Sequence, residues 1–265
     1  MNAISIRFLG TGGARFVVAK QIRASGGIWM RFGATQIHVD PGPGALVRAL
    51  STVPPQRPAE LDAIVLSHKH LDHAGDVNAM IEAMAQGGWR PRGVLVAPRD
   101  AWDDDSILLA YAQRFVPRHE IVNGPGAPFA INDVEVRASI RHQHPVDTYG
   151  YSFRYAGTTV SYLPCTRYFD GLIEDYRAHA PDVLVINVLR YADSMDVDHL
   201  TLDDAKRLIA GIRPGAAIMT HFGTKMLERD PRRIAYDLED ELGIRVYAAH
   251  DGWTYDAPMR QIDVA

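Results

Sequence analysis

Three histidines and one aspartate fall within six consecutive positions of the sequence. They are His68, His70, Asp72 and His73. They follow the apolar run Ala63–Leu66, which the pattern predicts to be a short buried strand. Residues two apart on a strand share a face, so His68 and His70 are expected to project together at its carboxyl end. Asp72 and His73 follow where the chain turns. Zn²⁺ accepts imidazole nitrogens and carboxylates, so the segment predicts a metal site.

Further ligand types stand where other predicted strands end. They are His144, Cys165 and His221. Sites in α/β proteins gather at strand ends, so we expect these side chains to converge on the same place. Asp40 also ends a predicted strand, and its carboxylate there could orient a ligand histidine. The alternative for Asp40 is a plain turn residue before Pro41.

The composition is that of an ordinary globular protein. The chain has 265 residues, of which 47% are apolar and 23% charged, and residues 1–265 are expected to form one domain. A net charge of -4 argues against a general nucleic-acid surface. No apolar run approaches the roughly 20 residues of a membrane span.

The expected location is the cytoplasm. The first residues alternate like a strand instead of forming a signal peptide. The single cysteine, Cys165, fits a reducing compartment. The sequence leaves the oligomeric state open, and an oligomer is compatible with it.

Short apolar strands alternate with helical patterns along the whole chain. The predicted strands are Ile4–Leu9, Thr35–Val39, Ala63–Leu66, Val94–Ala97, Val134–Ile140, Gly150–Tyr155, Thr159–Leu163, Val183–Val188, Ala216–Thr220, Arg245–Ala249 and Trp253–Asp256. The predicted helices are Asp76–Gln86, Ala101–Phe115, Phe169–Ala178, Leu202–Ile212 and Pro231–Leu242. Strand clusters in both halves, each followed by helices, predict an α/β protein in which outer helices cover two sheets.

The run from His68 to His73 resembles the HxHxDH signature of the metallo-β-lactamase superfamily. The pattern is closest to the ribonuclease Z-like and cyclic phosphodiesterase members. Similar family motifs are Leu9-Gly10-Thr11-Gly12-Gly13, Asp40-Pro41-Gly42, Thr220-His221-Phe222 and Asp251-Gly252. The resemblance implies a four-layer αβ/βα sandwich, with two mixed sheets flanked by helices.

The resemblance also implies a site for two metal ions. One ion would be held by His68, His70 and His144, and the other by Asp72, His73 and His221. The expected cofactor is one or two Zn²⁺ ions, with Mn²⁺ or iron as alternatives.

Cys165 departs from the pattern of the hydrolytic phosphodiesterase members, which place a bridging aspartate at this position. A thiolate binds zinc at about 2.3 Å, so Cys165 can still serve as a ligand, and its softness favours zinc over manganese. The alternative is that Cys165 is not a ligand and that only one ion binds firmly.

The expected function is metal-dependent hydrolysis of a small phosphate ester, which could be cyclic, through a metal-bound hydroxide. Asp72 would orient the nucleophilic water. His199, in Asp198-His199-Leu200-Thr201, resembles the His-Leu-Ser/Thr element of the related phosphodiesterases, and would act as general acid or bind phosphate. The alternative for His199 is a histidine that only flanks a helix cap.

Two other functions stay open. One is hydrolysis of a lactone, thioester or β-lactam, which the sulfur of Cys165 favours. The other is a metal-binding protein without turnover, because Cys165 replaces the usual aspartate. The expected partner is a small-molecule substrate. Ribonuclease Z activity itself is disfavoured, because the chain is not basic and shows no long insertion resembling a tRNA-binding arm.

Overall fold

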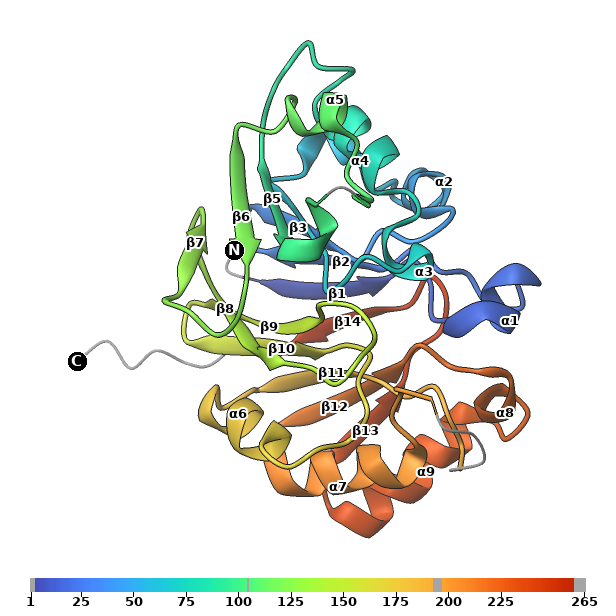
Figure 1. The fold of residues 1–265 in the computed structure, drawn as a ribbon. Helices are drawn as coiled ribbons and strands as arrows, with labels where there is room; N and C mark the ends of the chain where they lie inside the picture. The colour runs from blue at the N-terminus through green and yellow to red at the C-terminus, as the bar shows by residue number, and fades with distance from the viewer. Residues whose placement is uncertain (1–2, 104, 193–196, 260–265) are drawn as a thin grey trace.

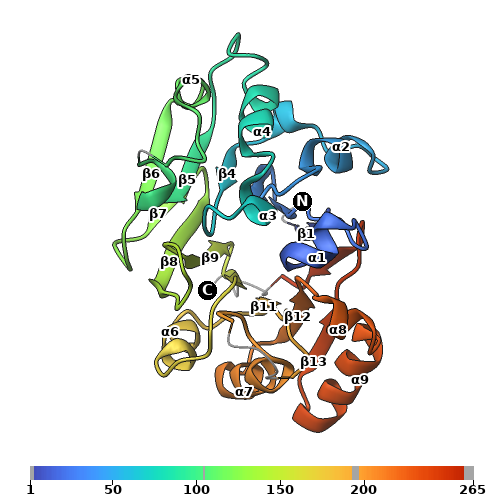
Figure 2. The ribbon, with the colours of Figure 1, turned by 45° about the vertical axis from the view of Figure 1, so that its right-hand side comes forward.

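Two sheets lie face to face, and helices cover the outer face of each, as Figures 1 and 2 show. The structure is a computed structural model that describes residues 3–103, 105–192 and 197–259. Within these residues each sheet has seven strands. The predicted four-layer αβ/βα sandwich is therefore confirmed.

The first sheet contains the amino-terminal strands and the last strand of the chain. Its strands are β1 (Ile4–Phe8), β2 (Ile28–Phe32), β3 (Thr35–Val39), β4 (Ala63–Val65), β5 (Val94–Pro98), β6 (Arg118–Val122) and β14 (Thr254–Ala257). Their order is β14-β1-β2-β3-β4-β5-β6. Pairing is antiparallel from β14 to β3 and parallel from β3 to β6.

The second sheet has a related plan. Its strands are β7 (Phe129–Ile131), β8 (Val134–Arg141), β9 (Tyr149–Tyr155), β10 (Thr158–Leu163), β11 (Val183–Asn187), β12 (Ala216–Thr220) and β13 (Arg245–Ala248). Their order is β13-β12-β11-β10-β9-β8-β7. The parallel half runs from β10 to β13.

The helices form the two outer layers. Those of the first half are α1 (Ala14–Ala19), α2 (Ala45–Leu50), α3 (Leu71–Ala74), α4 (Val77–Met84) and α5 (Ala110–Gln113), with 3₁₀ turns at Pro58–Glu60 and Arg99–Ala101. Those of the second half are α6 (Leu172–Ala178), α7 (Leu202–Ile212), α8 (Thr224–Leu227) and α9 (Pro231–Leu242). The helix α7 begins at a reciprocal capping box between Thr201 and Asp204.

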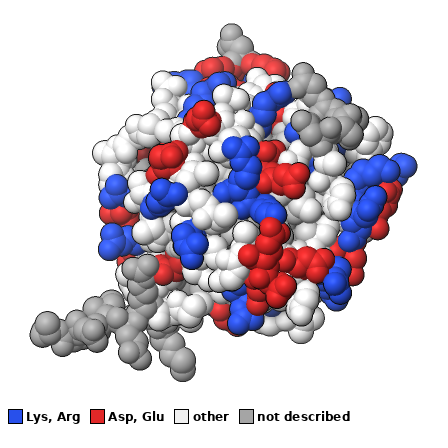
Figure 3. Space-filling model, turned by 90° about the horizontal axis from the view of Figure 1, so that it is seen from below, with Lys and Arg blue, Asp and Glu red and all other residues white. Residues whose placement is uncertain are grey.

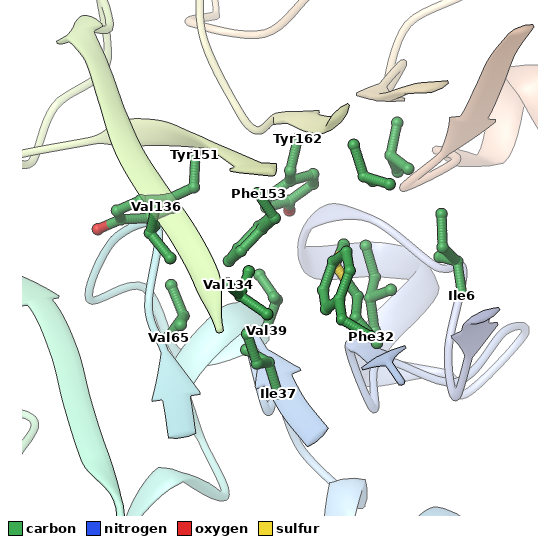
Figure 4. Close-up of a cluster of buried hydrophobic side chains, with 14 of the residues drawn as sticks. Ile6, Phe32, Ile37, Val39, Val65, Val134, Val136, Tyr151, Phe153 and Tyr162 are labelled. Carbon is green, nitrogen blue, oxygen red and sulfur yellow. The ribbon is translucent and has the colours of Figure 1, made fainter. Parts of the chain in front are cut away.

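The central core lies between the sheets, and alternate residues of each buried strand enter it. On β11, Val183 and Val185 face this core, whereas Leu184 and Ile186 face the outer helices. Figure 4 shows apolar side chains of both sheets meeting in this layer. Strands buried on both faces read as continuous apolar runs, which is why most of them could be found from sequence.

Three strands were not predicted. The strand β6 (Arg118–Val122) is polar and largely exposed at the edge of its sheet. The strand β7 (Phe129–Ile131) has only three residues. The strand β2 (Ile28–Phe32) is buried at four of its five positions and shows no alternation.

The predicted helix Ala101–Phe115 is wrong over most of its length, because among its described residues only Ala110–Gln113 is α-helical. The Ser106 hydroxyl lies within hydrogen-bond distance of the carbonyl oxygens of Ala101 and Leu108, to one of which it donates, and it accepts from the backbone N–H of Leu108. These side-chain bonds to the backbone compete with helical hydrogen bonds.

The strand β4 ends at Val65, one residue before the predicted end at Leu66, and His68 and His70 lie in the loop that follows it. The backbone N–H of Leu66 still bonds the neighbouring strand at Val96. The next carbonyl oxygen, that of Ser67, accepts from Tyr149 of the opposite sheet, so the chain leaves its sheet there. Within the described ranges, no helix is both long and apolar enough to cross a membrane.

His38 on β3 gives the fold a predicted sensitivity to pH. Burial lowers the pKa of His38 to about 4, although its hydrogen bond to the carbonyl oxygen of Gly26 opposes the shift. Between its ordinary pKa near 6.5 and pH 4 the unfolded chain binds a proton here that the folded chain does not. The stabilisation that depends on a neutral His38 is fully present above about pH 6.5. As the pH approaches 4, its loss lowers the free energy of unfolding by about 3 kcal/mol.

We expect His38→Gln to reduce the pH dependence of the unfolding free energy. The drop between pH 7 and pH 4.5, from urea denaturation, should be about 2 kcal/mol smaller than in the wild type. His119→Gln, at an exposed position of β6, should behave as the wild type. The same drop in His38→Gln and wild type would contradict this account.

Candidate metal centre

The short helix α3 lies at the boundary between the two sheets (Figure 1). This helix and the loop after β4 carry four donor side chains. His68 and His70 lie in the loop, and Asp72 and His73 in α3. The other donors follow the carboxyl ends of β8, β10 and β12 in the second sheet. Both sheets therefore contribute to one centre, as expected for strand ends.

The first cluster consists of His68, His70 and His144, whose donor atoms lie within 4.8 Å of one another. His70 Nδ1 lies 3.0 Å from His144 Nε2. His68 is fully buried, and its Nε2 has no hydrogen-bond partner among the described residues. A buried polar atom without a partner is rare, and here it faces two other ring nitrogens.

The second cluster consists of Asp72, His73 and His221, again within 4.8 Å. The Nε2 atoms of His73 and His221 lie 3.0 Å apart. Asp72 Oδ2 is 3.3 Å from His221 Nε2 and 3.6 Å from His73 Nε2. Histidine and carboxylate donors thus converge on one point.

Cys165 lies between the two clusters. Its Sγ is 3.4 Å from His73 Nε2 and 3.7 Å from His221 Nε2 in the second cluster. It also groups with His68 of the first cluster and His73 within 4.8 Å. The buried sulfur therefore faces donors of both clusters.

The separations between these donors fit a divalent ion such as zinc. Tetrahedral zinc with bonds of about 2.0–2.1 Å to nitrogen and 2.3 Å to sulfur places two nitrogens about 3.3 Å apart, and nitrogen and sulfur about 3.5 Å apart. The observed 3.0 Å between nitrogens and 3.4–3.7 Å between sulfur and nitrogen are close to these values. Sulfur with imidazole favours zinc over harder ions.

A single buried carboxylate, Asp40, is linked by hydrogen bonds to candidate ligands of both clusters. Its oxygens accept from Ser67 N at 2.6 Å, Ser67 Oγ at 2.6 Å, His73 Nδ1 at 2.8 Å and the Tyr162 hydroxyl at 2.8 Å. The role expected for Asp40 from the sequence, orienting a ligand histidine, matches its contact with His73.

These bonds also fix which nitrogen of each ring carries hydrogen. His73 Nδ1 donates to Asp40, so in the neutral ring the lone pair lies on His73 Nε2, which faces the second cluster. Ser67 Oγ gives its hydrogen to Asp40, so it must accept from His68 Nδ1, 2.9 Å away. His68 Nε2 therefore carries the lone pair, which a metal ligand requires.

The two clusters differ in charge. Burial lowers the pKa of His68 well below its usual value and that of His144 to about 4. The first cluster therefore presents neutral rings, the form that binds metal.

In the second cluster, charged neighbours counteract the effect of burial on the pKa values. Burial alone lowers the pKa of His221, but Cys165 and Asp72 raise it to about 9. Burial raises the pKa of the Cys165 thiol, but His221, His73 and His199 bring it well below its usual value. Two anionic groups here require positive charge nearby, which a divalent cation supplies.

Asp40 and His221 have left-handed backbone conformations. The φ angle is 51° at Asp40 and 60° at His221, and such strain in residues other than glycine concentrates at functional sites. Gly13 packs against His221 so closely that a Cβ there would lie 2.3 Å from His221 Nδ1. The glycine turn after β1 therefore supports this ligand.

His199 lies beside both clusters. Its ring centroid is 5.1 Å from that of His144 and 5.9 Å from that of His221. Arg190 donates two hydrogen bonds to the His199 carbonyl oxygen, and Asp198 O contacts His144 Nδ1 at 2.9 Å. The segment that carries His199 thus also holds a ligand of the first cluster.

Two polar residues of the centre, Tyr162 and Asn187, were not predicted from the sequence. Tyr162 bonds Asp40, and Asn187 Nδ2 contacts both Tyr162 and Cys165. The available signal was an amide at the carboxyl end of the apolar run Val183–Asn187.

Asp40→Asn is predicted to weaken metal binding. The amide removes the negative acceptor that orients His73, and loss of such a partner typically costs about 10–100-fold in metal affinity. Competition with a chromophoric chelator measures this affinity. Asp62→Asn, which changes a carboxylate that bonds Gln36 N, should retain the wild-type value. Equal affinity in Asp40→Asn and wild type would show that Asp40 does not organise the ligands.

The chain matches a known protein family and a known relative over most of its length. The family model described as "Beta-lactamase superfamily domain" matches residues 35–222. The uncharacterized protein MJ1374 of Methanocaldococcus jannaschii is 30% identical over 258 residues, which cover 94% of this chain and 93% of the relative.

Two solved structures of low identity share the fold. The probable metallo-hydrolase YhfI of Bacillus subtilis is 25% identical over 200 residues, which cover 75% of this chain and 80% of YhfI. Its crystal structure matches with a TM-score of 0.76 at 20% identity, covering 96% of this chain and 100% of that one. A diphosphatase from the PhnP family matches with a TM-score of 0.68 at 18% identity, covering 96% and 97%. The chain thus belongs to the metallo-β-lactamase superfamily.

Proposed function

We propose that this protein is a zinc-dependent hydrolase that cleaves a small phosphate ester, which could be cyclic, as a phosphodiesterase does. The metal ligands would be His68, His70 and His144 in the first cluster and Asp72, His73 and His221 in the second, with Cys165 between them. Zinc, when bound, supplies Lewis acidity and makes hydroxide available near neutral pH.

The position of His199 is the observation that carries the proposal. Its ring interacts with the Cys165 side chain, and its buried Nδ1 has no partner within the described residues. Nε2 is therefore the nitrogen that faces the centre, where it would hold a proton for the leaving oxygen of a phosphate ester. Arg190 fixes the segment by bonding the His199 carbonyl oxygen, so the ring can be oriented before substrate binds.

Asp72 would have a second role besides ligation. Its side chain is 20% exposed, whereas that of His73 beside it is 4% exposed. A carboxylate at the open side of the centre can orient the attacking water. We propose this role for Asp72.

A small-molecule substrate is proposed over a nucleic acid. Basic and acidic side chains are interspersed on the face seen in Figure 3, and the net charge is -4. A polyanion would favour a continuous basic surface. Similarity to a diphosphatase supports phosphorus chemistry for this chain.

Hydrolysis of a lactone or thioester is the second candidate. The observation that favours it is the sulfur of Cys165 between the clusters, where the resemblance to phosphodiesterases leads us to expect an aspartate. The reaction type must therefore be decided by assay.

The deciding experiment compares substrates on the zinc-loaded protein, with metal counted by mass spectrometry. We expect two ions per chain, turnover of bis-p-nitrophenyl phosphate, loss of turnover with a chelator and recovery with Zn²⁺. Turnover of lactones or thioesters alone would support the second candidate. Full metal loading without turnover of any of these substrates would refute both and leave a metal-binding protein.

His199→Ala is predicted to lower kcat for bis-p-nitrophenyl phosphate by about 10²–10⁴-fold, the usual contribution of a general acid. The metal content should stay at the wild-type value, because His199 is not among the proposed ligands. His119→Ala, at an exposed histidine of β6, is the matched control and should change neither quantity. Wild-type turnover in His199→Ala would remove this residue from the mechanism.

A further inference from the structure

Asn187 is a buried amide that contacts the unusual sulfur of the centre. It is the last residue of β11, and 3% of its surface is exposed. Its Nδ2 lies 3.5 Å from Cys165 Sγ and 3.2 Å from the Tyr162 hydroxyl. Both of these contacts of Asn187 are therefore made by one nitrogen.

The orientation of this amide is fixed by its neighbours. The Tyr162 hydroxyl gives its hydrogen to Asp40, at 2.8 Å, so the phenol oxygen must accept from Asn187. Turning the amide over would place its oxygen against the Tyr162 oxygen and the Cys165 sulfur, where three acceptors would meet. The N–H group of Asn187 consequently points at Sγ.

The amide oxygen shows that this arrangement has a cost. Asn187 Oδ1 is buried and has no hydrogen-bond partner in the described part of the chain. A buried amide oxygen left unpaired is unfavourable, and an apolar residue of similar size would avoid the cost. A role for the nitrogen explains why an amide stands here.

Sulfur needs such a partner more than a carboxylate does. An aspartate has two oxygens that can divide their contacts, whereas Cys165 offers one large atom to donors of both clusters. An N–H group aimed at sulfur restricts where it lies and reduces the electron density that it donates to a metal.

We propose that Asn187 is a positioning residue that holds Cys165 Sγ between the two clusters through an N–H···S hydrogen bond. The inference rests on the metal centre of the proposed function and not on its substrate. The chain Asp40–Tyr162–Asn187 then links the sulfur to the carboxylate that orients His73.

The test is the absorption spectrum of the Co²⁺-loaded protein, since a sulfur ligand gives a charge-transfer band in the near ultraviolet. We expect this band in the wild type and its loss in Cys165→Ser. Asn187→Leu and Asn187→Asp both remove the N–H donor and should move the band to longer wavelength. Affinity for Co²⁺ should fall about 10-fold.

The matched control is Asn78→Leu, which removes an amide that bonds Ile107 O and Leu109 N away from the centre. Its spectrum should equal that of the wild type. If Asn187→Leu does not fold, Asn187→Asp, which keeps the shape of the side chain, decides the question.

An unchanged band in the Asn187 variants at equal cobalt content would overturn the inference. A wild-type spectrum without the band, or a band that survives in Cys165→Ser, would also overturn it, because sulfur would not be a ligand. Zn²⁺-dependent turnover of bis-p-nitrophenyl phosphate, measured in parallel, is independent of these outcomes. A shifted band with no turnover in the wild type would support the role of Asn187 and refute the proposed function.

Discussion

Asp40 accepts four hydrogen bonds within a buried space, and each of them connects it to the metal centre. His73 receives its orientation directly, and His68 receives it through the Ser67 hydroxyl. Tyr162 carries the connection across to the opposite sheet. Without this carboxylate the rings could take either tautomer, and the nitrogens that face the centre would have no fixed lone pairs.

The sandwich supplies the framework that such a network requires. Asp40 follows β3 of the first sheet, whereas Tyr162 and Asn187 belong to β10 and β11 of the second. The apolar layer between the sheets, in which Phe32 and Phe153 stack with centroids 5.8 Å apart, holds these strands in place. Because close-packed layers resist small displacements, donors from different sheets can stay within hydrogen-bond distance of one another.

Much of this arrangement could be predicted from the sequence, because the strongest signals are local. The spacing of His68, His70, Asp72 and His73 indicated a metal site, and apolar runs such as Val183–Val188 indicated strands. The edge strand Arg118–Val122 escaped detection, since its polar residues show no apolar pattern.

The network behind the ligands could not be predicted, because it depends on contacts between distant parts of the chain. Asp40 and Tyr162 are 122 positions apart, and nothing in either segment reveals their hydrogen bond. The place of Cys165 between two clusters likewise follows from how the sheets meet. The sequence shows which residue types are present and how they are spaced. The packing of the fold decides which of their atoms face one another.

The most direct measurement of the central claim is a crystal structure of the zinc-loaded protein with anomalous data at the zinc edge. The account predicts two zinc ions, one at each cluster, with Cys165 Sγ at about 2.3 Å from at least one of them. It also predicts that the nitrogens of His68 and His73 bound to zinc are those not engaged by Ser67 and Asp40. A single ion with Sγ outside bonding distance, or ligation through the Nδ1 atoms of these histidines, would contradict it.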